Sequence, residues 1–197
     1  RQMCIRDSRM VKRAFDLTAA LILSVLLAVP AAILMLLIRL DSPGPAIFRQ
    51  ERLGKNGKPF MILKLRSMRL DAEKNGPRWA ERNDSRCTRL GSFLRRSRLD
   101  ELPQLWNILH GEMSFVGPRP ERAYFYDQFE KTIPGFRNRL AVIPGLTGLA
   151  QVNGGYDLSP DQKIVFDMKY IENCCVGMDL SCMLKTVRLV FTHEGAR

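Results

Sequence analysis

The chain has 197 residues, of which 46% are hydrophobic and 26% charged, so its composition allows a sizeable core and excludes a disordered or low-complexity protein. Lys and Arg number 31 and Asp and Glu 20, which gives a formal net charge of +11. This charge predicts a polyanionic partner: a nucleic acid, an anionic membrane surface or a phosphorylated substrate. The five cysteines lack CxxC spacing, which argues against a disulfide scaffold or a structural zinc site and is compatible with a reducing cytosol.

The first eight residues, RQMCIRDS, resemble translated sequencing-adapter read-through rather than natural protein sequence. We therefore expect residues 1–9 to be a non-native leader that forms no structure. Whether the natural protein is longer stays open.

Residues 17–38 carry no charge and are long enough, as a helix, to cross the hydrocarbon core of a bilayer. Pro30 lies inside this run, where it removes a backbone donor and predicts a kink or a break. A membrane span normally has its Lys and Arg excess on one side, but here basic residues flank both sides: Arg9, Lys12, Arg13 and Arg39. These residues favour a re-entrant membrane helix over residues 10–40, although a kinked span stays open.

Residues 41–197 are polar enough to form a cytosolic domain. Residues 46–52 and 60–68 are predicted strands of a short β-hairpin, and residues 71–86 form a predicted polar loop. Helices are expected over residues 88–97, 100–110, 122–131, 160–172 and 178–191. The expected fold is therefore α+β and mostly helical. The basic amphipathic helix over 178–191 suits either a membrane surface or the domain core.

Asp100 and Glu101 begin the predicted helix over 100–110. Acidic residues in a first turn commonly do no more than cap a helix. Here, however, several arginines surround the pair: Arg89, Arg95, Arg96 and Arg98. Their positive field is expected to keep Asp100 ionised, as a carboxylate nucleophile requires. Two adjacent carboxylates also suit Mg²⁺, which binds one or two carboxylates together with substrate phosphates.

Arg119 lies between two prolines, which fix the flanking backbone. The guanidinium presented in this way suits bidentate binding of phosphate. The alternative is a rigid surface turn with an exposed arginine. Lys64 and Arg66 alternate along the second predicted strand and are expected on one face, either solvated or extending a phosphate site. Gln151 and Asn153 alternate in a glycine-rich segment, where their amides suit contacts to a nucleobase or a sugar. That segment matches neither the P-loop nor the dinucleotide-binding pattern.

Six motifs in fixed order resemble those of one family, from about Val11 to the C-terminus. They are KRAFD at 12–16, KLRSM at 64–68, LDELPQ at 99–104, MSFVGPRP at 113–120, PGLTG at 144–148 and QVNG at 151–154. The family is that of the bacterial sugar transferases, also called monotopic phosphoglycosyl transferases.

The resemblance implies an enzyme that moves a sugar-1-phosphate from a UDP-sugar to a polyprenyl phosphate such as undecaprenyl phosphate, and releases UMP. It also implies a covalent aspartyl-phosphosugar intermediate and a role in starting membrane-linked glycans: exopolysaccharide, capsule, O-antigen or glycoprotein. The phospholipid membrane is then a further partner, and the implied location is the cytoplasmic face of the bacterial inner membrane.

By position, the resemblance implies that Asp100 is the nucleophile and that Glu101, with Asp100, holds Mg²⁺. It also implies that Lys64, Arg95 and Arg119 lie near the phosphates. Pro30 matches the proline that turns the family's membrane helix back, which implies the re-entrant form. Family members often have an arginine where this chain has Gly155, so the charge is expected to come from elsewhere or the donor to be recognised differently.

Two readings compete with the enzyme. A membrane-tethered nucleic-acid-binding module would explain the charge, but the chain lacks a helix-turn-helix, zinc or aromatic-stacking signature, so no nucleic-acid partner is expected. A non-enzymatic amphipathic membrane scaffold would leave Asp100, Glu101 and the segment 117–120 unexplained. The sequence identifies neither the sugar nor the glycan, and it leaves open whether the chain forms a homodimer.

Overall fold

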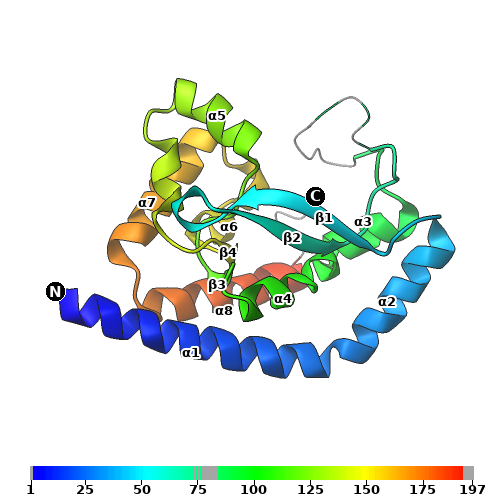
Figure 1. The fold of residues 1–197 in the computed structure, drawn as a ribbon, viewed down its shortest axis with the longest axis horizontal. Coiled ribbons are helices and arrows are strands. Elements are labelled where there is room, and N and C mark those ends of the chain that lie inside the picture. Colours follow the sequence, from blue (N-terminus) through cyan, green and yellow to red (C-terminus); the bar gives the residue numbers. More distant parts are fainter. Residues whose placement is uncertain (1, 73, 75, 77–83, 193–197) are drawn as a thin grey trace.

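The computed structural model of the chain describes residues 2–72, 74, 76 and 84–192, without the side chains of residues 2–9, 156 and 191. The molecule is mostly helical with two small two-stranded sheets, as expected for the α+β class (Figure 1). Helix α1 begins at Gln2, so the expectation that residues 1–9 form no structure is wrong for the backbone from Gln2 onward. The non-native origin of this segment stays a prediction.

The N-terminal part consists of two helices that meet at a bend of 60°, α1 (Gln2–Leu26) and α2 (Ala28–Asp41). The break falls at Leu27 because Pro30, in the first turn of α2, has no N–H to donate to the carbonyl of Leu26. The predicted break is therefore confirmed. Among the described residues, no single helix is long and apolar enough to cross a membrane, although this bent pair meets the same criteria when taken together.

The hairpin consists of β1 (Ile47–Leu53) and β2 (Pro59–Leu65), which pair antiparallel across the short turn η1 (Lys55–Gly57). This confirms the predicted hairpin, although β2 ends before residue 68. One core packs the hairpin against α1 and α4 through Ala20, Phe60, Ile62, Leu105, Ile108 and Met113. Helices α1 and α4 therefore cover one face of the hairpin, the lower one in Figure 1.

Helix α3 (Arg89–Arg96) begins after Thr88, whose side chain accepts a hydrogen bond from the Gly91 N–H at 2.9 Å. The predicted helix over 100–110 is shorter than expected. Its start is a separate 3₁₀ turn, η2 (Leu99–Glu101), and α4 covers only Gln104–Leu109. The two elements separate because Pro103 stands at the N-terminal boundary of α4 and supplies no backbone donor.

The remaining helices predicted from the sequence are confirmed within two residues at each end: α5 (Ala123–Thr132), α7 (Pro160–Asn173) and α8 (Val176–Thr192). Short turns that were not predicted connect them: η3 (Phe136–Ala141), α6 (Leu149–Val152) and η4 (Gly155–Asp157).

A second sheet was not predicted. It pairs β3 (Ser114–Val116) with β4 (Gly145–Thr147) in parallel. The backbones approach so closely that a Cβ on Gly145 would lie 2.1 Å from the Gly117 nitrogen, so only glycine fits. This contact joins the segment before Arg119 to the glycine-rich segment.

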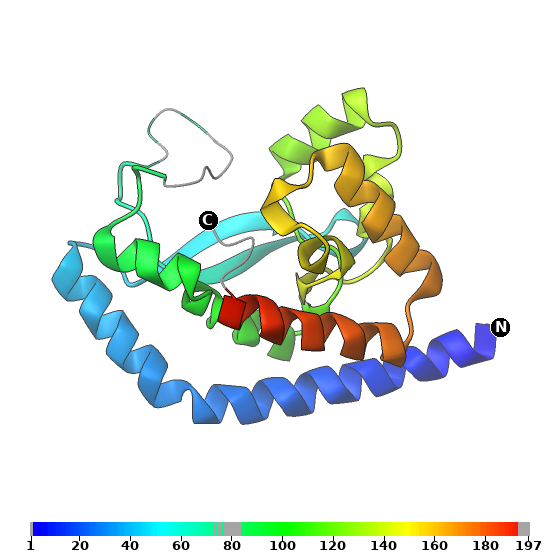
Figure 2. The same cartoon turned by 180° about the vertical axis from the view of Figure 1, so that it is seen from behind.

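Helix α1 docks on the domain through the KRAFD motif. Lys12 pairs with Asp179 of α8 at 2.7 Å, and Asp16 accepts a hydrogen bond from the Phe115 N–H at 3.2 Å. The Arg13 guanidinium donates to the last carbonyls of α4, those of Ile108 and Leu109, at 2.6 and 3.0 Å. Helix α8 runs alongside α1 in both views (Figures 1 and 2). The motif thus fixes α1 to three separate elements.

Candidate active site

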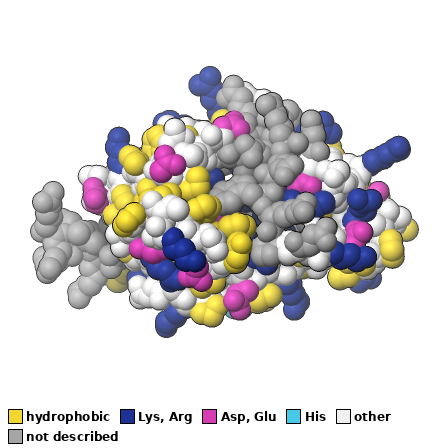
Figure 3. Space-filling view, turned by 90° about the horizontal axis from the view of Figure 1, so that it is seen from above, with side chains coloured by type: hydrophobic (Ala, Val, Ile, Leu, Met, Phe, Trp, Pro, Cys, Tyr) yellow, Lys and Arg dark blue, Asp and Glu magenta, His cyan; other side chains and the backbone are white. Residues whose placement is uncertain are grey.

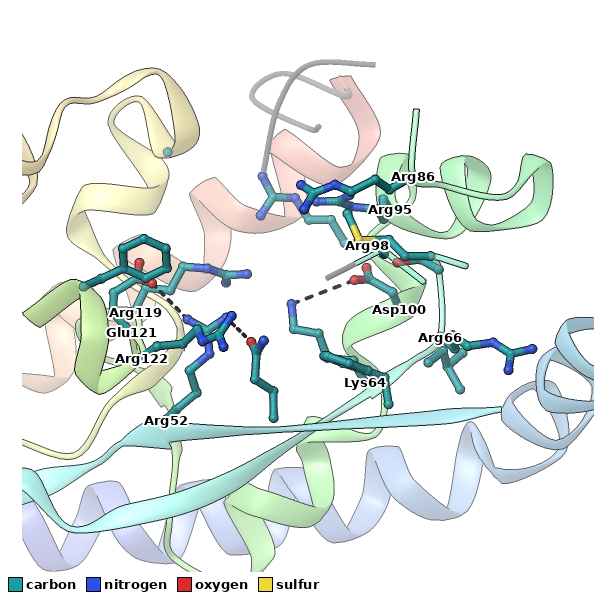
Figure 4. A pocket seen from close by; sticks show the side chains of 18 of the residues that line it. Arg52, Lys64, Arg66, Arg86, Arg95, Arg98, Asp100, Arg119, Glu121 and Arg122 are labelled. Atoms are coloured by element: carbon teal, nitrogen blue, oxygen red, sulfur yellow. Dashed lines mark hydrogen bonds and ion pairs between the residues drawn. The ribbon is translucent and has the colours of Figure 1, made fainter. Parts of the chain in front are cut away.

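A cavity of about 430 Å³ lies above the hairpin (Figure 4). It is lined by the hairpin, the α3–η2 connection, the segment after β3, and residues of α5, α6 and α7. Among the described lining residues two are acidic, Asp100 and Glu121, and eleven are basic: Arg52, Lys64, Arg66, Arg69, Arg86, Arg95, Arg98, Arg119, Arg122, Arg139 and Lys163. Such a wall suits a ligand with several negative charges.

Asp100 reaches the cavity from the turn η2, and only 7% of the residue is exposed. Lys64 Nζ lies 3.9 Å from its Oδ2 (Figure 4). Burial raises the pKa of Asp100, and Glu101 raises it further, although Lys64, Arg95 and Arg119 act in the opposite direction. The expected cations surround Asp100, but burial outweighs their effect on its pKa. That Asp100 is ionised stays a prediction.

Glu101 lies beside Asp100 but is held differently. Its Oε1 accepts hydrogen bonds from Lys64 Nζ at 3.0 Å and from Arg119 Nη2 at 2.6 Å. Burial by itself would raise the pKa of Glu101, but the two cations outweigh it and hold that pKa well below its usual range. The two neighbouring carboxyl groups therefore have pKa values shifted in opposite directions.

Arg119 is held by its backbone. The Gly117 N–H donates to the Thr147 carbonyl at 2.8 Å, and the Gly145 N–H donates to the Pro118 carbonyl at 3.0 Å. With prolines on both sides of Arg119, these bonds leave little freedom to the segment that presents its guanidinium. The flanking prolines therefore act together with the β3–β4 contact.

Candidate site residues from the sequence line the same cavity: Lys64, Arg95, Asp100, Arg119 and Gln151, together with Arg66 and Arg98. Glu101 lies directly behind them, bonded to Lys64 and Arg119. Gln151 is 8% exposed, and its Nε2 donates to the Leu146 carbonyl at 3.1 Å. Residues separated by as many as 87 positions thus meet at one site.

Other residues singled out in the sequence are placed differently. Asn153 is exposed, donates to the Leu149 carbonyl at 2.7 Å and is not a lining residue. Arg66 lines the cavity, but its guanidinium donates to the carbonyls of Pro43 and Ser42 at 2.9 and 2.6 Å, beyond the end of α2. Arg89 and Arg96 are exposed outside the lining. Arg66 therefore has a structural contact that strand alternation could not predict.

Several lining residues were not singled out by the sequence. Arg52 of β1 pairs with Glu121 at 2.9 Å. Arg122 at the start of α5, Arg139 of η3 and Lys163 of α7 add further positive charge. Only Glu121 had a local signal, because it directly follows the Pro118–Pro120 segment. The others reach the cavity through tertiary packing.

The described residues contain no group of three or more His, Cys, Asp and Glu side chains that could hold a metal ion. Asp100 and Glu101 offer two adjacent carboxylates, the number that Mg²⁺ uses when substrate phosphates and water complete its coordination shell. The donor set therefore fits Mg²⁺ only together with a phosphorylated ligand.

A family model described as "Bacterial sugar transferase" matches residues 7–193. The chain belongs to the bacterial sugar transferase family. The match includes the hairpin, the Asp100–Glu101 turn and the Pro118–Pro120 segment, so the cavity lies wholly within the family region.

Three relatives are similar along nearly all of this chain. A UDP-N-acetylgalactosamine-undecaprenyl-phosphate N-acetylgalactosaminephosphotransferase of Aeromonas hydrophila is 43% identical over 190 residues, 95% of this chain and 45% of that protein. UDP-glucose:undecaprenyl-phosphate glucose-1-phosphate transferases of Caulobacter vibrioides and Escherichia coli are 43% and 39% identical over 94% and 96% of this chain. The bacterial sugar transferase region described here spans 71% of the Caulobacter protein but 42% of the Escherichia coli protein.

Proposed function

We propose that this bacterial sugar transferase is a phosphoglycosyl transferase, which moves a sugar-1-phosphate from a UDP-sugar to undecaprenyl phosphate and releases UMP. The names of the relatives support the substrate classes. The observation that carries the proposal is the Asp100 carboxyl group, which faces a cavity lined by eleven described cations and lies beside a Glu101 held by Lys64 and Arg119. A sugar diphosphate and a lipid phosphate are both polyanions, as that lining requires.

In the proposed mechanism, an Asp100 carboxylate oxygen attacks the sugar-bearing phosphorus of the UDP-sugar. The bond from this phosphorus to the bridging oxygen breaks, and UMP leaves with the electron pair. A phosphate oxygen of undecaprenyl phosphate then attacks the same phosphorus and displaces Asp100 as a free carboxylate. Two successive displacements at one phosphorus, through a covalent adduct on an enzyme side chain, are the usual form of covalent catalysis.

The raised pKa of Asp100 gives Lys64 a specific role in this scheme. Lys64 is the strongest of the cations that stabilise the ionised form of Asp100, and it also binds Glu101 at 3.0 Å. Arg95 and Arg119 contribute in the same direction. These cations would hold the diphosphate oxygens and keep the nucleophile ionised.

Asp100 and Glu101 would hold Mg²⁺ together with the substrate phosphates. When bound, the ion would neutralise the diphosphate and favour departure of UMP. Glu101 stays ionised over a wide pH range, because Arg119 and Lys64 keep its pKa low despite burial.

The bent α1–α2 pair would be a re-entrant membrane element, with both ends on the cytoplasmic face of the inner membrane. Pro30 and the bend of 60° support this arrangement, as do the basic residues Arg13 and Arg39 at its two flanks. Residues 41–197 would then form the cytosolic catalytic domain, with the cavity close to the lipid acceptor. The reaction would start a membrane-linked glycan.

The test is an assay of UMP release by detergent-solubilised protein with Mg²⁺, undecaprenyl phosphate and a panel of UDP-GalNAc, UDP-glucose and UDP-galactose. We expect UMP with at least one donor, and only in the presence of the lipid phosphate under multiple-turnover conditions. No UMP from any donor would overturn the proposal.

The nucleophile is tested with Asp100→Asn, which keeps the shape of the side chain but removes the attacking charge. We expect no turnover and no covalent phosphosugar adduct by intact-mass analysis with the donor that the parent protein uses. Arg49→Gln, an exposed position on the same hairpin outside the cavity, is the control and should retain both. Turnover by the Asn variant would refute the role of Asp100.

A further inference from the structure

A buried ion pair lies at the cavity wall, where Arg139 is one of the lining residues. Arg139 Nε donates to Asp167 Oδ2 at 2.6 Å, and the two side chains are 2% and 1% exposed. Arg139 comes from the turn η3 and Asp167 from α7. Removing two charges from water is costly, so a pair like this needs precise geometry and further hydrogen bonds.

The guanidinium of Arg139 makes a further bond that leads to the site. Its Nη2 donates to the backbone carbonyl of Arg119 at 3.1 Å. The same guanidinium lies 4.8 Å from the ring centroid of Phe136, which limits its movement. Arg139 thus joins α7 to the backbone of the residue whose side chain binds Glu101 at 2.6 Å.

The bond from Arg139 to the Arg119 carbonyl adds to other restraints on the backbone of this proline-flanked segment. The segment is already fixed on one side by the β3–β4 bonds, in which the Gly145 N–H donates to the Pro118 carbonyl. The Arg139 bond fixes the next carbonyl, that of Arg119 itself. Two successive carbonyls are therefore held, and the direction in which the Arg119 side chain leaves the backbone depends on both.

We infer that Arg139, oriented by Asp167, is a positioning residue that sets the place of the Arg119 guanidinium relative to Glu101 and the substrate phosphates. This inference rests on the proposed function. Arg139 acts through the Arg119 carbonyl, so its contribution requires the Arg119 side chain.

The test is a double-mutant cycle with Arg139→Lys and Arg119→Ala. Lysine keeps the buried charge but cannot bond Asp167 and the Arg119 carbonyl with the separate nitrogens of one planar group. We expect Arg139→Lys to lower kcat/KM for UMP release by about 10- to 100-fold, since small displacements at a reacting centre cost that much. In the Arg119→Ala background it should cost less than about twofold.

Leu140→Ala is the matched control. Leu140 neighbours Arg139 in η3 and packs in the core with Leu53, Tyr126 and Phe136, so its truncation destabilises the same element without removing the bond to Arg119. We expect a lower Tm for Leu140→Ala with kcat/KM per folded molecule retained. Equal losses from Arg139→Lys in both Arg119 backgrounds, or an equal loss of kcat/KM in the control, would overturn the inference.

A failure of the proposed function would be visible separately, as a parent protein that releases no UMP. In that case the same four proteins are compared by isothermal titration calorimetry with UDP as the probe. Arg139→Lys should then weaken UDP binding in the protein that retains Arg119, and it should leave UDP binding unchanged in the Arg119→Ala variant. Additive losses of UDP affinity would overturn the positioning role.

Discussion

Asp100 and Glu101 are adjacent in the chain, yet their surroundings give them different acidities. Asp100 is buried and Glu101 is partly buried. The Glu101 Oε1 has two direct cationic donors, whereas the Asp100 Oδ2 has Lys64 at 3.9 Å. The pKa of Asp100 is raised by burial, and that of Glu101 is lowered because the cations outweigh burial. Divergent pKa values in one pair are typical of groups with separate chemical tasks. This divergence is consistent with the proposal that Asp100 attacks the substrate while Glu101 keeps its negative charge.

The raised pKa of Asp100 predicts a pH profile. Asp100 must be ionised to attack, so kcat falls as the pH drops through its pKa. Lys64 is the strongest cation that opposes the shift, so Lys64→Gln should raise the pKa of Asp100 further and move the acid limb of the kcat profile to higher pH. The profile is measured from residual UMP release at saturating Mg²⁺.

Arg49→Gln removes one positive charge from the same hairpin, but at an exposed position outside the cavity. Its acid limb should coincide with that of the parent. An acid limb that stays in place or moves to lower pH in Lys64→Gln would contradict the assigned electrostatics.

The sequence could identify the site residues whose chemistry is indicated by their immediate neighbours in the chain. The pair Asp100–Glu101 and the proline-flanked Arg119 are of this kind, and both lie at the cavity or directly behind it. The sequence could not rank burial against charge at Asp100, because burial depends on the packed surroundings. Arg139 was missed for the same reason: nothing near it in the chain indicates a bond to a carbonyl 20 positions away.

At the scale of elements, α3 lies unusually close to the end of the hairpin. A Cβ built on Gly91 would lie 1.8 Å from the Ser67 carbonyl oxygen, and the Thr88 N–H donates to that same oxygen at 3.1 Å. This approach brings Arg95, near the end of α3, to the cavity wall. The absence of a side chain at Gly91 thus determines how near α3 lies to Asp100.

Gly91→Ala should therefore be destabilising, although alanine favours helices. The new methyl group would collide with backbone, which cannot move aside as a flexible side chain can, and overpacking of this kind costs about 1–3 kcal/mol. Gly177→Ala in α8 is the matched control, because its Cβ would meet no described atom within 4 Å. That variant should gain about 0.5 kcal/mol from helix propensity. Thermal unfolding in detergent distinguishes the two, and similar Tm changes would disprove the close-approach argument.

Elements with strong local signals were predictable. The hairpin and four helices follow the hydrophobic periodicity, and the break between α1 and α2 follows from Pro30. The β3–β4 pair was not predictable, because each strand has only three residues and the pairing joins Ser114 to Gly145 across 31 positions. Such short parallel strands depend on the surrounding fold rather than on their own pattern.

At the scale of the molecule, the charge of +11 is distributed unevenly. On the face seen from above, the visible basic side chains are interspersed with acidic ones (Figure 3). In the cavity, eleven of the described lining residues are basic and two are acidic. The excess is therefore concentrated where the phosphorylated substrates are proposed to bind, and further basic residues, such as Arg13 and Arg39, flank the apolar helices.

The proposed membrane arrangement predicts a labelling pattern. In a background without native cysteines, Met10→Cys and Asp41→Cys flank the bent pair, and Leu26→Cys lies at its apex. A membrane-impermeant thiol reagent should label both flanks only after the inner membrane is opened, because both ends of a re-entrant element face the cytoplasm. The apex position should stay protected in the membrane. Labelling of one flank in intact spheroplasts would make the pair a kinked span.

Helix α4 acts as a spacer with a set length. Arg13 of α1 grips the last two carbonyls of α4, and the first residue of α4, Gln104, comes three positions after Glu101. Six residues of helix extend about 9 Å. In the proposed re-entrant arrangement the Arg13 flank of α1 lies at the cytoplasmic surface of the bilayer, so the proposed nucleophile would keep a constant depth relative to the lipid headgroups. The enzyme would then meet every polyprenyl acceptor at its phosphate end, so that the length of the hydrocarbon tail has little influence on where the transferred phosphorus is delivered.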